Sequence, residues 1–327
     1  MDYRNILIIQ TAFIGDAILA SSLLEKLHHR FPESSISILV RKGNESIYKD
    51  HPFLKNVLVW DKSRGKFKNL LNLLFEIRKK RFDCVINCHR YTSSGLLTAF
   101  SGAKHSAGFK QNPFSFLFNR SVPHRLQKGL HEIERYNQLV SDFAGEDLFK
   151  PKLYPGESDA LAVKSLTDGK FVCIAPASVW FTKQLPKSKW IELCRSFSSD
   201  ISVYILGAES DNDLAKEIIE QSGRSGMLNL CGKLSLLQSC SLMNKAVMNY
   251  VNDSAPLHLA SSMDSPVKAF FLSTHVDFGF GPLSGRSAVI EVKGLPCRPC
   301  GLHGFKACPK GHFRCGLDMD MNEARLP

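Results

Sequence analysis

Residues 5–40 read NILIIQTAFIGDAILASSLLEKLHHRFPESSISILV. The first six residues are a short apolar, β-branched run, which is typical of a buried strand. Residues 17–30 then place apolar side chains at helical spacing, and residues 35–40 form a second apolar run. This order of strand, helix and strand predicts a βαβ unit with parallel strands at the start of the chain.

The same alternation continues, breaks at the Pro- and Gly-containing stretch 150–159, and then restarts. Two successive α/β halves predict two Rossmann-like, doubly wound domains that face a cleft, residues 1–155 and residues 156–327. We expect further strands at 57–60, 83–87, 171–175, 202–206, 247–251 and 267–272, helices at 67–80, 131–144, 187–197, 211–221, 235–244 and 256–262, and irregular structure at 107–127.

Composition places the chain among folded globular proteins, with 44% apolar and 22% charged residues in 327. No apolar run is long enough to span a bilayer, and the N-terminus lacks the pattern of a signal peptide. These features predict a cytoplasmic protein. Its ten cysteines are therefore expected to be thiols or metal ligands rather than disulfides.

The net charge of +11 favours an anionic partner. Nucleic acid, an anionic membrane surface and phosphorylated sugars all qualify, and a solubilising surface is the alternative. No helix-turn-helix, zinc-finger or RNA-binding signature is present, so we expect no nucleic-acid partner.

Ligands of doubly wound sheets bind beyond the carboxyl ends of the strands, so the loops there are the candidate site. The first loop, TAFIGD at 11–16, lacks the GxGxxG fingerprint of dinucleotide-binding folds. Gly15 is expected in a tight turn. Asp16 is either the N-cap of the next helix or a general base that faces the cleft.

Two loops of the second half carry charged candidates. Lys183 precedes a helix that Pro186 is expected to start, and a cation beside free backbone N–H groups forms a phosphate site. The alternative is an ordinary surface lysine. Glu209 is placed to accept hydrogen bonds from ribose hydroxyls, or else it belongs to the acidic first turn of the next helix.

Residues 252–258 read NDSAPLH. Asp253 or Ser254 is expected to cap a helix, and His258 follows one turn later on the same side. A diphosphate bound at this helix end would contact Ser254, backbone N–H groups and His258. A histidine packed in the core is the alternative.

Four cysteines cluster near the C-terminus at positions 297, 300, 308 and 315. The first two have the CxxC spacing of zinc sites, whereas the later spacings are irregular. The sequence leaves two interpretations open, a structural zinc site and reduced cysteines that pack in the protein.

Taken together, the loops resemble those of glycosyltransferase family 9, the ADP-heptose–lipopolysaccharide heptosyltransferases, over nearly the whole chain. Residues 252–258 are similar to the family's Asn-Asp-Ser-Gly-Pro-x-His signature, with Ala255 in place of glycine. Residues 182–186 (TKQLP) are similar to its Thr-Lys-x-Trp-Pro segment, with Leu185 in place of tryptophan. The Gly15-Asp16 loop, residues 207–209 and 232–236, and the cysteine-containing segment also match.

The resemblance implies a GT-B fold and an inverting transfer of heptose from ADP-heptose to a lipid-linked acidic saccharide of the lipopolysaccharide core, with no metal ion or cofactor. Another nucleotide-sugar donor, or a nucleotide-sugar-binding protein without catalysis, remains an alternative. The implied roles are Asp16 as base; Ser178, Val179, Lys183, Ser254, Ala255 and His258 around the diphosphate; Glu209 at the ribose, Leu234 at the adenine and Asp253 at the sugar.

A lipid-linked acceptor also implies peripheral contact with the inner face of the inner membrane. The basic, Phe-containing segment 109–125 lies in the half that the resemblance assigns to the acceptor. We expect it to contact the acceptor or anionic lipid headgroups through Lys104, Lys110, Arg120 and Arg125. The alternative is a solvated loop whose phenylalanines pack inward.

Overall fold

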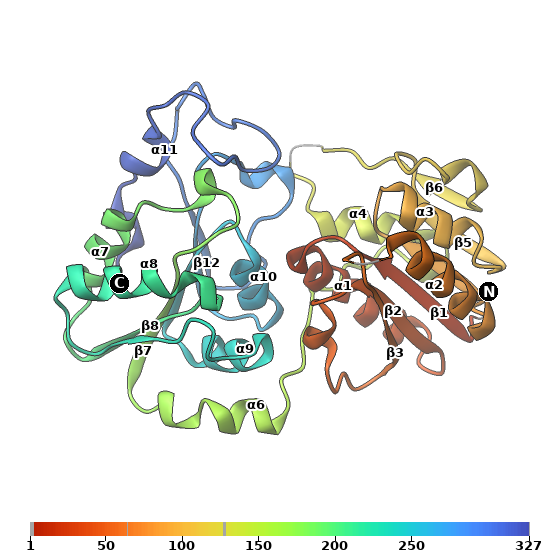
Figure 1. The fold of residues 1–327 in the computed structure, drawn as a ribbon, viewed down its shortest axis with the longest axis horizontal. Helices are drawn as coiled ribbons and strands as arrows, with labels where there is room; N and C mark the ends of the chain where they lie inside the picture. Colours follow the sequence, from red (N-terminus) through yellow and green to blue (C-terminus); the bar gives the residue numbers. More distant parts are fainter. Residues whose placement is uncertain (1–2, 64, 127–128, 327) are drawn as a thin grey trace. The chain divides into compact units, whose positions relative to one another are not determined.

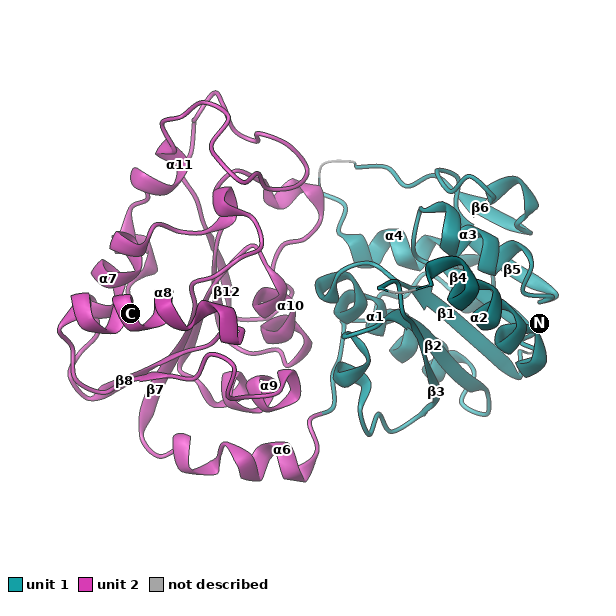
Figure 2. Cartoon of the chain, in the orientation of Figure 1, with its two compact units in different colours: residues 1–154 teal, residues 155–327 magenta. Residues whose placement is uncertain are grey.

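The structure is a computed structural model that describes residues 3–63, 65–126 and 129–326. The chain forms two compact units, Met1–Tyr154 and Pro155–Pro327 (Figure 2). The sequence placed this boundary after residue 155. Each unit is an α/β domain with helices packed on a parallel sheet (Figure 1).

Unit 1 contains a six-stranded sheet in the order β3-β2-β1-β4-β5-β6. All of its strand pairs are parallel. The elements are β1 (Asn5–Gln10), α1 (Ile14–Arg30), β2 (Ser35–Arg41), β3 (Leu54–Trp60), α2 (Lys66–Lys80), β4 (Cys84–Asn87), α3 (Thr92–Ala99), β5 (His105–Phe109), β6 (Arg120–Val122), α4 (Glu132–Gln138) and α5 (Ser141–Ala144).

Unit 2 repeats this architecture in the order β12-β11-β10-β7-β8-β9, again with parallel pairs. Its elements are α6 (Glu157–Ala162), β7 (Lys170–Ala175), α7 (Lys187–Ser196), β8 (Ile201–Ile205), α8 (Asn212–Ser222), β9 (Met227–Asn229), α9 (Leu236–Lys245), β10 (Met248–Asn252), α10 (Ala255–Ser262), β11 (Val267–Phe270), β12 (Ser287–Ile290) and α11 (Arg314–Leu317).

The central strands explain why the opening sequence determines the fold. Every residue of β1 after Asn5 is buried, because helices cover both faces of a doubly wound sheet. When the strands of each unit are numbered from 1 to 6 along the chain, both sheets have the order 3-2-1-4-5-6. This is the strand order of the Rossmann fold. The α/β fold class predicted from the sequence, with two doubly wound domains, is confirmed.

Several short elements were missed. Residues 107–127 were expected to be irregular, but they include part of β5 and all of β6. Strand β5 reads HSAGF and lacks the β-branched run that is typical of a buried strand. A Cβ on Gly108 would lie 2.5 Å from the ring of Phe118, so only glycine fits there. The helix expected at 131–144 is divided into α4 and α5, and α3, α6, β9 and β12 were not predicted.

The four cations expected to contact the acceptor or lipid, Lys104, Lys110, Arg120 and Arg125, lie at both ends of two neighbouring strands. Lys104 precedes β5 and Arg120 begins β6, so both lie at the amino ends of parallel strands. Lys110 and Arg125 follow the carboxyl ends of the same strands. The guanidinium of Arg120 is also engaged inside unit 1, 3.1 Å from the carboxylate of Asp142. The four cations are therefore divided between the two ends of these strands, and contact with the acceptor or with lipid stays a prediction.

No helix within the described ranges is both long enough and apolar enough to cross a membrane.

Candidate active site

The strand order defines one switch point in each unit, where the chain changes its direction of travel across the sheet. In unit 1 this point lies between β1 and β4, and in unit 2 between β7 and β10. Ligands of open parallel sheets bind beyond the carboxyl ends of the strands at such points. The loops that follow these four strands, two in each unit, therefore form the candidate site.

The loop after β1 is fixed by side chains from three neighbouring loops. The Thr11 hydroxyl lies 2.9 Å from Nδ1 of His89, which follows β4. The carbonyl of Thr11 accepts a hydrogen bond of 2.8 Å from Lys62 Nζ, and that of Ala12 accepts one of 3.1 Å from Asn44. The start of α1 is thus held rigidly at the carboxyl edge of the sheet.

Asp16 lies in the first turn of α1. The N-cap residue is Phe13, so the interpretation of Asp16 as the N-cap is wrong. The backbone N–H groups of Phe13 and of Asp16 itself lie near its carboxyl group, and they lower its pKa. Gly15 was expected in a tight turn, but it occupies a helical position without a positive φ.

The environment of Asp16 disfavours its ionised form. The pKa of the Asp16 carboxyl is raised from 3.8 to about 7. Burial is the main cause and the nearby charge of Glu132 the second, against the lowering effect of the two backbone N–H groups and Arg90. A general base works best when its pKa lies near the working pH. The carboxyl of Asp16 therefore has the proton affinity that base catalysis at neutral pH requires.

Glu132 keeps its charge because two basic side chains hold it. His124 Nε2 lies 3.0 Å from one carboxylate oxygen, and Arg135 Nη1 lies 2.7 Å from the other. Although burial opposes ionisation, the hydrogen bonds and charges of His124 and Arg135 hold the pKa of Glu132 below its usual value. All three side chains are buried. Sequence reasoning missed this cluster, because its members lie in segments that showed no motif.

In unit 2 the side chain of Asn252 ties the two loops of the switch point together. Its Oδ1 accepts the backbone N–H of Leu185 at 3.0 Å, and its Nδ2 donates to the carbonyl of Pro176 at 2.8 Å. Asn252 is fully buried at the end of β10. It positions the loop that carries Lys183, a role that the sequence motif did not reveal.

Lys183 and Asp253 form an ion pair across this switch point. Lys183 Nζ lies 2.7 Å from Asp253 Oδ2, and the two side chains are 16% and 8% exposed. The same oxygen accepts a hydrogen bond of 2.6 Å from the hydroxyl of Thr274. Lys183 is therefore held at the carboxyl edge of the sheet, and the ordinary surface lysine is excluded.

Helix α10 begins at the same place. Its N-cap residue is Ser254, whose side chain makes no capping hydrogen bond and instead donates to the carbonyl of Asn252 at 3.4 Å. Ala255 is the first residue of the helix, and His258 is buried one turn later with its ring 6.4 Å from that of Phe280. The N-terminus of α10 thus lies beside the Lys183–Asp253 pair.

The loops after β8 and β9 also lie against each other. The N–H of Gly232 donates to the carbonyl of Gly207 at 2.9 Å, and a Cβ on Gly232 would lie 2.9 Å from Cα of Glu209. Glu209 is exposed, and Leu234 is half-buried. Asp211, and not Glu209, accepts the N–H of Ala208. The carboxylate of Glu209 is accordingly accessible from solvent.

Ser178 and Val179 belong to the same loop as Lys183. The carbonyl of Ser178 accepts a hydrogen bond from the side chain of Gln184, which closes the loop on itself. Val179 is exposed at the tip. The loops after β7 and β10 in unit 2 therefore hold Ser178, Val179, Lys183, Asp253, Ser254, Ala255 and His258, whereas Glu209 and Leu234 lie in the loops after β8 and β9.

The cysteine-containing segment packs directly on the Lys183 loop. Thr182 and Phe305 are joined by two hydrogen bonds. The backbone N–H of Thr182 donates to the carbonyl of Phe305 at 3.1 Å, and the backbone N–H of Phe305 donates to the hydroxyl of Thr182 at 2.8 Å. A Cβ on Gly304 would lie 2.3 Å from Cβ of Trp180 and 2.8 Å from Cγ of Lys183. This segment therefore fixes the backbone around Lys183.

The four cysteines lie near enough to one another for their charges to interact, but they do not form a metal site in the described residues. In residues 3–63, 65–126 and 129–326, no three His, Cys, Asp or Glu side chains converge as metal ligands. Cys315 belongs to the hydrophobic core of unit 2, and Cys308 packs against it. Burial raises the pKa of the Cys315 thiol to about 11. These properties fit the packing interpretation.

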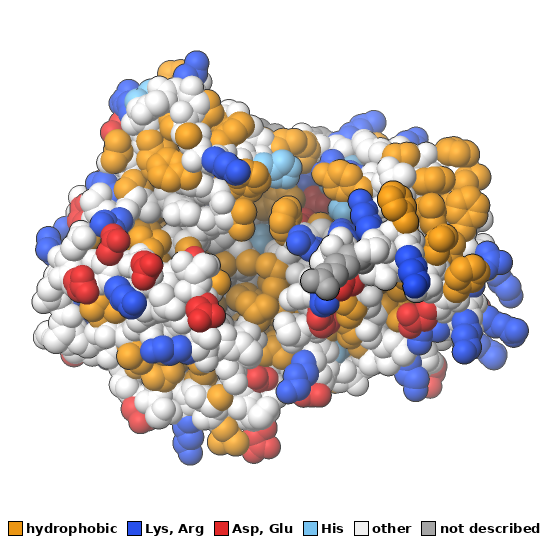
Figure 3. Space-filling view, in the orientation of Figure 1, with side chains coloured by type: hydrophobic (Ala, Val, Ile, Leu, Met, Phe, Trp, Pro, Cys, Tyr) orange, Lys and Arg blue, Asp and Glu red, His pale blue; other side chains and the backbone are white. Residues whose placement is uncertain are grey.

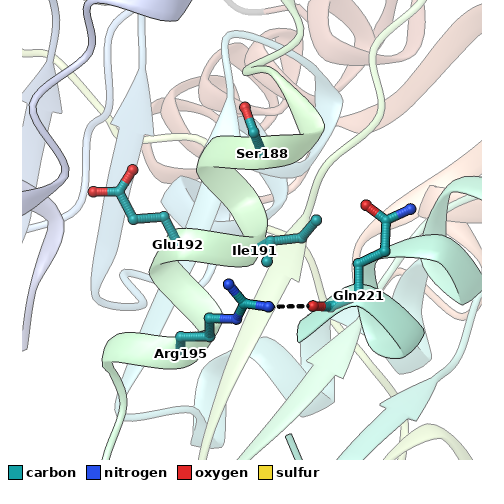
Figure 4. A pocket seen from close by; sticks show the side chains of 5 residues that line it. All are labelled: Ser188, Ile191, Glu192, Arg195 and Gln221. Atoms are coloured by element: carbon teal, nitrogen blue, oxygen red, sulfur yellow. Dashed lines mark hydrogen bonds between the residues drawn. The ribbon is translucent and has the colours of Figure 1, made fainter. Parts of the chain in front are cut away.

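A further pocket of about 380 Å³ lies between α7 and α8 (Figure 4). Arg195 and Gln221, which line it, lie at the C-terminal ends of these helices, and helices of such folds run antiparallel to the strands. The pocket therefore extends toward the amino edge of the sheet. Arg195 donates to the Gln221 carbonyl at 2.6 Å, so its guanidinium stabilises the end of α8.

Comparison with known proteins identifies relatives over most of the chain. The model of glycosyltransferase family 9 (heptosyltransferase) matches residues 70–304. Lipopolysaccharide heptosyltransferase 2 of Salmonella typhimurium is 23% identical, with 88% of each chain covered. Lipopolysaccharide heptosyltransferase 3 of Escherichia coli is 25% identical, with 80% of each covered.

Solved structures of similar fold agree with the architecture. A family 9 glycosyltransferase from Veillonella parvula superimposes with a TM-score of 0.81 and 20% identity, covering 89% of this chain and 86% of that one. The ADP-heptose lipopolysaccharide heptosyltransferase II of Escherichia coli has a TM-score of 0.77 and 20% identity, covering 98% and 100%. The GT-B type of fold inferred from the sequence is confirmed.

The raised pKa of Asp16 predicts how stability depends on pH. Ionising Asp16 in the folded protein costs free energy, so its contribution to stability falls as the pH rises from 3.8 to about 7 and stays lost above. Asp16→Asn removes this cost. We expect the free energy of unfolding of the variant, relative to that of the wild type, to be about 1–4 kcal/mol higher at pH 8 than at pH 4.

Urea unfolding across this pH range measures the difference. Asp213→Asn is the matched control, because Asp213 also lies in the first turn of a helix but is exposed. A difference between Asp16→Asn and wild type that stays constant with pH would show that the carboxyl is not desolvated.

The packing of Gly304 on Lys183 predicts a second effect. Gly304→Ala forces Trp180 or Lys183 to move, because a Cβ there meets both side chains closer than 3.0 Å. We expect binding of ADP, measured by calorimetry, to weaken about tenfold, as for one weakened hydrogen bond to a charged group. Gly285→Ala is the control, since its Cβ meets nothing closer than 3.8 Å. Equal affinity in both variants would contradict the positioning role.

Proposed function

The chain belongs to glycosyltransferase family 9, and from this premise we propose that it transfers a heptose from ADP-heptose to an acidic, lipid-linked saccharide of the lipopolysaccharide core. The proposal extends to inversion at the anomeric carbon and to catalysis without a metal ion or cofactor. The observation that carries it is the desolvated carboxyl of Asp16, with a pKa of about 7, at the switch point of unit 1.

In this proposal unit 2 binds the sugar donor. A diphosphate at the N-terminus of α10 would meet its free N–H groups, the hydroxyl of Ser254 and the ammonium of Lys183. Asp253, now paired with Lys183, would turn to the hydroxyl groups of the sugar. The remaining assignments are Ser178, Val179, Ala255 and His258 at the diphosphate, Glu209 at the ribose and Leu234 at the adenine.

The proposed reaction is a single displacement. The acceptor hydroxyl gives its proton to the carboxylate of Asp16, and its oxygen attacks the anomeric carbon on the face opposite the diphosphate. The bond from this carbon to the diphosphate oxygen breaks, and its electron pair leaves with ADP. Lys183, His258 and the helix N-terminus stabilise the negative charge of the leaving group, which is the largest contribution expected of such a site.

Unit 1 offers a cationic surface for an acidic acceptor. The pKa of Lys62 is lowered to about 8, mainly by burial and then by the nearby charges of Arg41 and Lys66. Arg41 also lies 5.9 Å from the exposed ring of Phe13, next to the start of α1. Crowded cations favour an anionic ligand, because its charge relieves their repulsion. A carboxylate or phosphate of the saccharide would bind here.

Thermal shift with ADP-, UDP- and GDP-sugars tests the nature of the sugar donor, since a ligand stabilises the fold that binds it. Stabilisation by a UDP- or GDP-sugar alone would assign another sugar donor to the same scaffold. Stabilisation by ADP-heptose without turnover would leave a binding protein.

The base role predicts the effect of one conservative change. Asp16→Asn is expected to lower turnover at least about 10²-fold at pH 8 while ADP binding is retained. In the wild type, kcat/KM is expected to rise with pH and to level off above about 7, as Asp16 ionises. Steady-state kinetics from pH 5.5 to 9 measures both. Turnover within threefold of wild type, with Asp213→Asn as control, would refute base catalysis.

The ion pair of unit 2 predicts a loss in binding of the sugar donor. Lys183→Ala removes the cation beside the helix N-terminus, and we expect the dissociation constant of ADP to rise about 10- to 100-fold, as for one charge-assisted contact. The matched control is Lys170→Ala, because Lys170 lies at the amino end of the same strand and is exposed. An unchanged dissociation constant for Lys183→Ala, measured by calorimetry, would remove Lys183 from the diphosphate site.

A further inference from the structure

Helix α2 of unit 1 carries a buried apolar face and, beside it, a set of exposed apolar side chains. Leu70, Leu73 and Ile77 are buried in the core against the sheet. Phe67 and Phe75 are 79% and 67% exposed, and Leu71 between them is exposed as well. Folding of unit 1 therefore uses only the buried face.

The exposed residues form one stripe. Phe67, Leu71 and Phe75 are spaced by four residues, which places them in a row along the helix surface. At about 100° per residue, the centre of this row lies about 130° around the helix from the centre of the buried face. Leu74, which packs partly buried against the core, lies between the two sets of residues, so the stripe adjoins the core face but is itself exposed. Large exposed apolar patches mark sites of interaction.

Further apolar side chains extend the stripe beyond α2. Arg78 donates a hydrogen bond of 3.0 Å to the carbonyl of Phe100, an exposed residue at the end of α3. The ring of Phe100 lies 6.1 Å from that of Phe114, which precedes the 3₁₀ turn η2 (Ser115–Leu117). In this turn Phe116 is 79% exposed. We call these exposed side chains the α2–η2 surface: Phe67, Leu71, Phe75, Phe100, Phe116 and Leu117.

The charges beside the stripe are positive. Lys68, Arg78 and Lys79 are exposed and lie next to the row of Phe67, Leu71 and Phe75 on the helix surface. The acidic residue of this helix, Glu76, projects to another side and lies 3.9 Å from Lys80. The space-filling view shows hydrophobic side chains gathered over α2 and α3 with lysines and arginines beside them (Figure 3).

Most of the net positive charge of the chain lies in unit 1, the unit that contains α2. Residues 1–154 contain 24 lysines and arginines and 14 aspartates and glutamates, so unit 1 carries +10 of the net charge of +11. Unit 2 carries only +1. An anionic partner is therefore attracted to unit 1 as a whole, and it is attracted to α2 in particular.

We propose that the α2–η2 surface docks on an anionic lipid bilayer, with the apolar side chains at the level of the headgroups and the flanking cations on lipid phosphates. Apolar burial and attraction to anionic lipids are the two contributions that hold interfacial helices on membranes. A second copy of the chain is the weaker fit, because a two-fold contact through this surface would bring Lys68, Arg78 and Lys79 toward their own copies.

This inference rests on the proposed function in one respect, that a lipid-linked acceptor resides on a membrane. It places the membrane contact on α2 and on η2, which lies within the segment 109–125 expected from the sequence, and it replaces Lys104, Lys110, Arg120 and Arg125 by Lys68, Arg78 and Lys79 as the cations. It leaves the cations beside α1 to the acceptor saccharide.

Co-sedimentation of the full chain with vesicles tests the proposal. The vesicles contain phosphatidylcholine alone or phosphatidylcholine and phosphatidylglycerol in equal parts. We expect at least tenfold stronger partitioning to the anionic vesicles and a steep loss at high salt. The variant Phe67→Ser, Leu71→Ser, Phe75→Ser is expected to lose at least tenfold. Lys68→Gln with Lys79→Gln is expected to lose about 25-fold, at about fivefold per cation.

Matched controls use the other unit. Leu161→Ser removes an exposed leucine from α6, and Lys170→Gln removes an exposed lysine, and both are expected to bind vesicles as the wild type does. Turnover on a deacylated acceptor, free of any membrane, should be unchanged in the α2 variants. That measurement separates failure of the docking surface from failure of the proposed transferase reaction.

Three results would overturn the proposal. The first is equal partitioning of the wild type to both kinds of vesicle. The second is wild-type binding by the triple serine variant. The third is a dimer, detected by analytical ultracentrifugation without vesicles, that the triple serine variant abolishes, because the stripe would then be covered by a second copy.

Discussion

Parallel strand pairing is the constraint on which the rest of the structure depends. Every pair in both six-stranded sheets is parallel, so the connection between two strands must cross from one end of the sheet to the other through a helix or a long loop. For the same reason, the carboxyl ends of all strands of a unit lie at one edge. Segments far apart in sequence therefore meet there. Asn252 can bond to Leu185 and Pro176, and Thr11 to His89, only because their strands end side by side. The candidate site follows from this geometry before any particular chemistry is considered.

The two switch points place their acidic residues in opposite electrostatic environments. In unit 1 a carboxyl group is desolvated and lies near a second carboxylate, which Arg135 and His124 keep ionised, so the pKa of Asp16 rises to about 7. In unit 2 the carboxylate of Asp253 is paired directly with Lys183 and bonded to Thr274. A group that must exchange a proton needs the first environment, and a group that must hold a fixed charge needs the second. This contrast supports different roles for the two acids.

The sequence was sufficient for the fold because the strands of a doubly wound sheet are buried on both faces and read as continuous apolar runs. It failed at β5, where Gly108 makes room for Phe118, and at three-residue strands such as β9, which are too short to show a pattern. Within the candidate site, loops such as the one that carries Lys183 could be found from strand ends and motifs. The supporting contacts could not. Glu132, Asn252 and Gly304 act through partners that only the tertiary structure brings close.

Composition also cannot tell where a charge lies. The value of +11 suggested one basic segment, whereas the structure gives +10 to unit 1 as a whole and places Lys104 and Arg120 at the edge opposite Lys110 and Arg125. A nearly neutral unit 2 must bind an anionic ligand by local means, one lysine and the N–H groups of a helix end, and these act only at short range. A strongly basic unit 1 attracts anions from a distance of about a Debye length. On the proposed assignment, the sugar donor is recognised by shape and contact, whereas the acceptor and its membrane are approached through the field of the whole unit.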